Sequence, residues 1–210
     1  ARARGRLSAS HINMGERVRR LTQRVLTGHA SDGIYAVGQL GLIDSTSEDQ
    51  TPVSSINLLQ VLPSTYRTVC MDVRCEYILG LYSGFEHPST LTSLLAILNC
   101  VMSKVKFCKR YGVLIEEGEW HSRLVKRIRA DNGELISEKG MSTLSSMEVA
   151  AEFVRSYSGD MKGPVESTHK KLHRQADHLA AGSTLGMQKE RGEVAREGEA
   201  CRSFEQNMPF

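Results

Sequence analysis

The 210-residue sequence predicts an α/β fold in which helices flank a mixed five-stranded sheet. Three strand-like segments follow one another between residues 35 and 85. Helical and strand-like segments then alternate between residues 87 and 181. Strands joined by short turns pair antiparallel, whereas strands separated by helices pair in parallel, so one sheet with both kinds of pairing is expected.

The first half of the predicted core consists of strands. Strand patterns cover residues 35–46, 66–73 and 77–85, and residues 54–62 are a further candidate. Residues 62–65 form a proline-containing turn, and the polar residues 74–76 indicate a hairpin between the last two strands. Glu48 and Asp49 follow the first strand, where we expect them to face solvent in a hairpin.

Helices and strands alternate in the second half. One long helix is predicted from residue 88, with Pro88 in its first turn and Gly112 ending it. Its apolar stripe, at three- and four-residue steps, is expected to be core: Leu91, Leu94, Leu95, Leu98, Met102, Val105 and Cys108. A strand at 125–130, a helix at 141–149, a strand at 151–157 and a helix at about 162–180 complete the core.

Charge divides the chain into three parts. The net charge is only +3, yet residues 1–28 hold one acid and seven arginines: Arg2, Arg4, Arg6, Arg17, Arg19, Arg20 and Arg24. A basic arm beside a near-neutral domain suits a polyanionic partner, although a solvated tail has the same composition. We expect a basic arm or linker over residues 1–34, a folded core domain over 35–181 and an exposed extension over 182–210.

Composition and motifs also argue against several classes of protein. No stretch approaches the ~20 apolar residues of a membrane span, so no membrane partner is expected. Five cysteines without a C-x-x-C pair are typical of a reducing compartment. Neither glycine-rich phosphate-binding motif is present, which argues against nucleoside triphosphate binding.

Three acidic residues stand where a metal site needs them. Asp44 ends the apolar run 41–43, Asp131 ends the strand-like run 125–130, and Glu166 follows Asp131 by 35 positions on a predicted helix. Neighbouring strands lie ~4.8 Å apart, so two strand-end carboxylates can share an ion, to which a packed helix adds a third ligand. Two Mg²⁺ or Mn²⁺ ions held by such oxygens can neutralise a phosphodiester and activate the attacking oxygen. Taken singly, each acid has a plain alternative as a turn residue or a helix N-terminal charge.

The helix that carries Glu166 also carries cationic residues. Lys162 precedes Glu166 by four positions, and His169, Lys170 and His173 follow it by three, four and seven. Residues at these spacings share a helix face, so this strip is a candidate contact for DNA phosphates. Ordinary solvated helix charges are the alternative. In the basic arm, Arg17, Arg19 and Arg20 are further candidate DNA contacts.

Two other residues have open interpretations. Asp72, in an apolar strand, is either a fourth metal ligand or a hydrogen-bonded structural acid, and the structural role is favoured. Trp120 either stacks on an unpaired base or covers a core edge, and the core role is favoured.

Most of the chain resembles the catalytic domain of the DDE transposase and integrase superfamily, most closely its TnsB-type and Mu-type bacterial transposases. The spacing from Asp131 to Glu166 is the most specific feature. The family's usual Trp-Gln pair before the first aspartate is absent, Cys75 and Glu76 replace a Ser-Arg pair, and Pro164 stands where an aliphatic residue is usual. The resemblance lies in residues 42–46, 71–73, 78–89, 129–135, 160–166 and 182–193.

This resemblance implies a ribonuclease H-like fold and metal-dependent cleavage and strand transfer of DNA at transposon ends. Asp44, Asp131 and Glu166 would be catalytic and would hold two Mg²⁺ or Mn²⁺ ions. The implied partners are transposon-end and target DNA, further copies of the chain and other transposition proteins, in the bacterial cytoplasm at the nucleoid. Two alternatives are a nuclease of the same fold that does not join DNA, and a catalytically decayed DNA-binding fragment.

Overall fold

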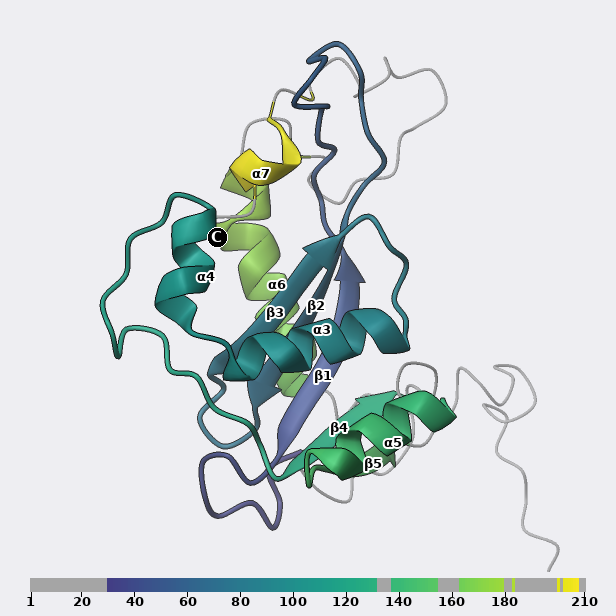
Figure 1. Cartoon of the computed structure of the whole chain (residues 1–210), viewed down its shortest axis with the longest axis vertical. Helices are drawn as coiled ribbons and strands as arrows, with labels where there is room; N and C mark the ends of the chain where they lie inside the picture. Colours follow the sequence, from purple (N-terminus) through teal and green to yellow (C-terminus); the bar gives the residue numbers. More distant parts are fainter. Residues whose placement is uncertain are drawn as a thin grey trace, which may run out of the picture.

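Five strands form one mixed sheet in the order β3-β2-β1-β4-β5 (Figure 1). The computed structural model describes residues 30–131, 137–154, 163–179, 183, 200 and 202–207, with Asp131, Val154 and Asn207 described by their backbone alone. β1 pairs antiparallel with β2 and parallel with β4, which confirms the predicted mixed sheet. The strands are β1 (Gly41–Ser47), β2 (Tyr66–Asp72), β3 (Ile78–Gly84), β4 (Arg127–Asp131) and β5 (Ala150–Val154).

The prediction of a strand at residues 54–62 is wrong, because these residues form a loop. It contributes only an isolated bridge between Val53 and Val61. Ser54 Oγ accepts hydrogen bonds from the backbone N–H groups of Ile56 and Asn57, at 3.3 and 3.4 Å. Such side-chain bonds compete with a strand ladder and favour a turn. The apolar residues that suggested a strand are exposed in this loop, Leu59 among them.

Helices cover both faces of the sheet. Figure 1 shows α3 and α5 on one face and α6 on the other. The first face has a core that includes Ile43, Ile97 and Leu144, and the second a core that includes Leu42 and Val165. The helices are α3 (Thr90–Val101), α4 (Lys104–Arg110), α5 (Glu138–Ser146), α6 (Gly163–Gln175) and α7 (Phe204–Asn207), with a 3-10 turn, η2 (Asp177–Leu179).

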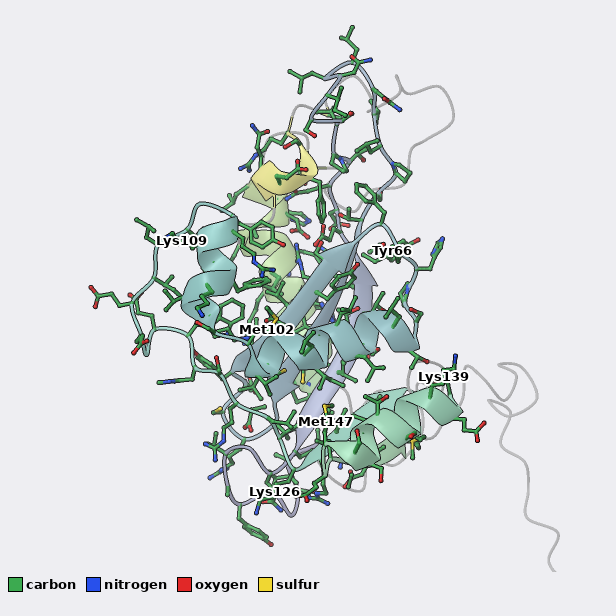
Figure 2. All side chains as sticks on the ribbon, viewed as in Figure 1. Tyr66, Met102, Lys109, Lys126, Lys139 and Met147 are labelled. Carbon is green, nitrogen blue, oxygen red and sulfur yellow. The ribbon has the colours of Figure 1, made fainter. Side chains whose placement is uncertain are left out.

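The predicted long helix is in fact two helices, α3 and α4, bent by 118°. Met102 leaves the helical region with φ −69° and ψ 151°, and it lies at this bend in Figure 2. Ser103 then caps α4 by accepting a hydrogen bond from the N–H of Lys106. A new N-cap in mid-pattern ends one helix and starts the next, which hydrophobic spacing alone does not reveal. Within the described residues no single helix is long and apolar enough to span a membrane.

The core face of α3 also differs from the prediction. Ala96, Ile97 and Cys100 are buried, whereas Leu91 and Leu98 are exposed. The helix lies close to β3, because a Cβ added to Gly80 would come within 2.5 Å of the carbonyl oxygen of Ala96. Small residues permit this approach, and the larger leucines therefore take the outer face.

α6 packs on the opposite face, against β1 and β2. Its buried residues are Val165, Thr168 and His169, and Val165 joins the core around Leu42 and Met71. The predicted helix is confirmed in position but ends at Gln175 rather than near residue 180. This packing sets the face of the sheet on which the candidate site is built.

Candidate metal centre

Asp44 lies in the middle of β1, not at a strand end as predicted, because the strand continues to Ser47, and it is partly buried. Its neighbours alternate between the two cores: Leu42 belongs to the core on the α6 side and Ile43 to the core on the α3 side. Successive strand residues point to opposite faces, so the Asp44 side chain lies on the same face as Leu42, toward α6.

Asp44 and Asp131 belong to adjacent parallel strands, β1 and β4. β1 and β4 pair through Gly41 with Ile128 and Leu42 with Arg129. Asp44 lies three residues beyond Gly41, and Asp131 lies three residues beyond Ile128. Asp131 is the last residue of β4, and its side chain is outside the described part of the structure. The pairing of β1 with β4 ends at Leu42 and Arg129, so Asp44 and Asp131 follow it by the same number of residues on adjacent strands.

α6 brings a second functional group to Asp44. His169 is buried, with 5% of its surface exposed, and its Nε2 lies 3.9 Å from Asp44 Oδ2. That distance suits an ion pair but is too long for a hydrogen bond. Within the described residues neither ring nitrogen of His169 has a hydrogen-bond partner. Glu166, one turn earlier in the first turn of α6, is exposed.

Burial lowers the pKa of His169, and the nearby Asp44 charge acts in the opposite direction without reversing the shift. The imidazole is therefore neutral at pH 7, with one ring nitrogen free to accept a hydrogen bond or a metal ion.

The donor types fit a divalent cation. Among the described side chains, which exclude that of Asp131, no group of three or more histidine, cysteine, aspartate or glutamate residues could hold a metal ion. What the structure brings together is the pair Asp44 and His169, with Glu166 on the same helix as His169. Carboxylate oxygens and an imidazole nitrogen without a partner are groups that a divalent ion can bind.

Comparison with known proteins identifies the family. The family model described as the TnsB C-terminal domain matches residues 42–182, more than half of the chain. The chain belongs to the TnsB C-terminal domain family. Its sequence is also 30% identical over 164 residues to the Transposon Tn7 transposition protein TnsB of Escherichia coli, a match that covers 78% of this chain. The resemblance drawn from the sequence is thus confirmed.

The TnsB match covers 23% of the Escherichia coli protein, so the chain spans less than a quarter of that relative's length. Two solved structures are similar at low identity. The simian T-cell lymphotropic virus intasome in complex with PP2A regulatory subunit B56 gamma matches with a TM-score of 0.46 and 12% identity, over 67% of this chain and 40% of that one. The catalytic core domain of BIV integrase matches with a TM-score of 0.40 and 15% identity, over 78% of this chain and 90% of that one.

The predicted cationic strip on this TnsB-family domain needs correction. Lys170 is exposed, as predicted, but His169 is buried against the sheet and unavailable to DNA. His173 lies among carboxylates, with its Nδ1 2.6 Å from Asp177 Oδ2 and 3.2 Å from Asp49 Oδ2. His173 is therefore engaged with carboxylates inside the fold and is not available to DNA. The other candidate DNA contacts, Lys162, Arg17, Arg19 and Arg20, lie outside the described residues.

Sequence reasoning missed a buried ionic cluster at the far end of α6, which we call the Arg67 cluster. Arg67 Nε lies 2.9 Å from Glu48 Oε1, and its Nη2 lies 2.6 Å from Asp177 Oδ1. Burial alone would lower the pKa of Arg67, but the two carboxylates outweigh it and raise that pKa. The expectation that Glu48 and Asp49 face solvent is wrong, because Glu48 is buried and Asp49 meets two imidazoles. The cluster consists of Glu48, Asp49, Arg67, His173, Asp177 and His178.

The two open interpretations are resolved toward structural roles. Asp72 is fully buried and accepts hydrogen bonds from the backbone N–H groups of Gly38, Arg74 and Cys75, at 2.6, 2.8 and 3.1 Å. It therefore ties two loops together. Trp120 donates from Nε1 to the carbonyl of Ile78 at 2.7 Å and covers the edge of the α3–α4 layer.

Proposed function

We propose that this domain is the catalytic core of a transposase that cleaves DNA at transposon ends and transfers the freed strand to target DNA. Asp44, Asp131 and Glu166 would hold two Mg²⁺ or Mn²⁺ ions. When bound, such ions neutralise the phosphodiester and lower the pKa of the attacking oxygen. The chain itself would supply the rigid sheet and helix on which the three carboxylates stand.

One observation supports the proposal: β1, which carries Asp44, and β4, which ends at Asp131, are adjacent parallel strands of a TnsB-family domain. Asp131 is the last residue of β4, and strand ends in parallel sheets are a common place for catalytic groups. α6 packs on the same face as Asp44 and carries Glu166 in its first turn. Three acids distant in sequence thus come from elements that pack together.

DNA would be held by cationic residues around this face. Lys170 is exposed on α6, one turn after Glu166, and is the described residue best placed to contact a phosphate. Lys162 and the arm residues Arg17, Arg19 and Arg20 are proposed to contribute further phosphate contacts. Cutting and joining need two DNA ends, so we propose a multimer of this chain on DNA. Other transposition proteins would act with it at the bacterial nucleoid.

The decisive experiment supplies the chain with Mg²⁺ or Mn²⁺, pre-nicked transposon-end DNA and a target plasmid. Joined products support the proposal. Shortened strands without joined products would assign the chain to the alternative, a metal-dependent nuclease.

A matched variant separates catalysis from DNA binding. Asp131→Asn keeps the shape of the side chain but removes its charge, so joining should fall by at least a hundredfold while DNA affinity is retained. The control is Asp32→Asn, in the turn before Ile34, which should join DNA like the wild type. Metal-independent DNA binding without any turnover in the wild type would instead favour the decayed DNA-binding fragment.

A further inference from the structure

His169 is a polar residue in an apolar position. It lies on the buried face of α6 with Val165 and Thr168 and exposes 5% of its surface. Val165 on the same face is fully buried among Leu42, Val69 and Met71. An apolar residue would complete this face, so the imidazole requires an explanation.

Neither ring nitrogen has a well-formed hydrogen bond within the described residues, although the Asp44 backbone lies close enough to act on the pKa of the imidazole against the effect of burial. Buried polar groups in native proteins are nearly always paired, and an unpaired one points to an absent water, ion or ligand. His173, on the same helix, has a carboxylate oxygen 2.6 Å from Nδ1. The aspartate beside His169 is more distant, at 3.9 Å, so the described side chains satisfy the imidazole of His169 less well than that of His173.

The position of Asp44 indicates which kind of partner the His169 imidazole lacks. Asp44 Oδ2 lies 3.9 Å from His169 Nε2, which is longer than a hydrogen bond. Two donors that each lie about 2.1 Å from one cation are separated by at most about 4.2 Å. The observed separation is within that limit, but it lies between the value for adjacent ligands of an octahedral ion, about 3.0 Å, and that for opposite ligands, about 4.2 Å. A small movement of the Asp44 carboxylate would therefore let both atoms bind one ion.

We propose that His169 Nε2 is a nitrogen ligand of the divalent cation that Asp44 holds. The proposal rests on the proposed function, because that function makes Asp44 a metal ligand. Imidazole suits later transition metals, whereas Mg²⁺ prefers oxygen ligands alone. This centre therefore binds Mn²⁺ in preference to Mg²⁺ more strongly than an all-carboxylate centre does.

Electron spin-echo envelope modulation of Mn²⁺ bound to the whole chain tests the ligand directly. A directly bound histidine nitrogen gives ¹⁴N modulation, which changes to the ¹⁵N pattern when the wild-type protein is made with ¹⁵N-labelled histidine. This measurement uses no variant, so it does not depend on whether a substituted protein folds.

Variants identify which histidine is bound. His169→Asn should remove the ¹⁴N modulation and lower the preference for Mn²⁺ over Mg²⁺ by about tenfold or more, since even outer-shell ligand partners change metal affinity 10–100-fold. His121→Asn, in an exposed loop, is the matched control and should keep both properties.

The outcomes separate this inference from the proposed function. Mn²⁺ that binds in an Asp44-dependent manner without histidine modulation overturns the inference and leaves the proposed function standing. Modulation that persists in His169→Asn, or a wild type that binds no Mn²⁺, also overturns it. If the modulation is lost only in His169→Asn but the wild type joins no DNA, the nitrogen ligand is supported and the proposed strand-transfer activity is refuted.

Discussion

At the scale of single residues, Lys104 shows how this fold uses a buried charge. Its side chain is 2% exposed, and Nζ donates to the backbone carbonyl and, at 2.8 Å, to the side-chain oxygen of Asn99. It also lies 4.3 Å from the centre of the Trp120 ring. These contacts fix α4 against the end of α3. Burial lowers the pKa of Lys104 to about 8, and nearby thiols act in the opposite direction.

Lys104 should make stability depend on pH above 8. Between about pH 8 and 10.5 the unfolded chain holds more protons at this residue than the folded chain, so the free energy of unfolding rises with pH in this window. Below pH 8 both states are protonated and the cost of burying the charge is fully present. Relative to Lys104→Met, the wild type should gain about 2 kcal/mol between pH 7.5 and 10, at 1.36 kcal/mol per unit of pKa difference. Urea unfolding at both pH values measures this, and parallel pH profiles would contradict it.

The Arg67 cluster leads to a second prediction at this scale. Asp177→Ala leaves the buried guanidinium of Arg67 with Glu48 as its one remaining carboxylate in the described cluster. Removing one partner of a buried ion pair typically costs about 3–5 kcal/mol, because the other charge stays buried. Urea unfolding should show a loss of this size. Glu117→Ala, at an exposed loop position, is the control and should change stability by less than about 0.5 kcal/mol.

At the scale of elements, the sequence predicted the kinds of element better than their burial. The strands and the order of helices follow from periodicity and turn residues, because those signals are local. The bend after Met102 and the outward face of Leu91 and Leu98 depend on a cap at Ser103 and on how closely α3 approaches β3. Close approach is a property of two elements together, which one sequence pattern does not contain.

The candidate site was likewise predicted only in part from the sequence. Asp44, Asp131 and Glu166 were predicted from apolar runs that end in an acid and from a helix start, and their role as metal ligands remains a prediction. His169 was assigned to an exposed strip because spacing gives a shared face but not which arc of the helix is buried. The Arg67 cluster joins β2 to η2, 110 residues apart, and no local signal reports such a pairing.

Gly80 supplies the prediction for the α3–β3 contact. A Cβ at this position would lie 2.5 Å from the Ala96 carbonyl oxygen and 2.7 Å from the Cys100 backbone nitrogen. Backbone atoms of a packed helix do not yield easily, so Gly80→Ala should destabilise the domain by about 1–3 kcal/mol. Gly163→Ala has no heavy atom within 4 Å of the added Cβ and begins α6, so it should be neutral or stabilise by up to about 1 kcal/mol. Equal thermal stability of the two variants would contradict this account of the close approach.

At the scale of the whole molecule, the sheet holds two groups of charges at different points along α6. His169, at the middle of the helix, lies beside Asp44, and the Arg67 cluster holds the far end of the helix through His173 and Asp177. These contacts hold α6 against the sheet at its middle and at its far end. This explains why the domain retains a buried ionic cluster that apolar residues of similar volume could replace.

The basic arm adds a prediction about the complete chain. Residues 1–28 carry seven arginines and one glutamate, a charge of +6, whereas the complete chain has a net charge of +3. Each phosphate that the arm neutralises releases counterions, so affinity for duplex DNA falls with salt at a slope of about −0.9 per contact. Deleting residues 1–28 should therefore reduce the slope of log affinity against log salt by up to about 5, measured by fluorescence anisotropy on one duplex.

Replacing Lys109 and Arg110 by glutamine at the end of α4 removes two cations elsewhere and should change the slope by less than 2. If the truncated chain keeps the full slope, the arm does not contact phosphates, and the cations around α6 must account for DNA binding.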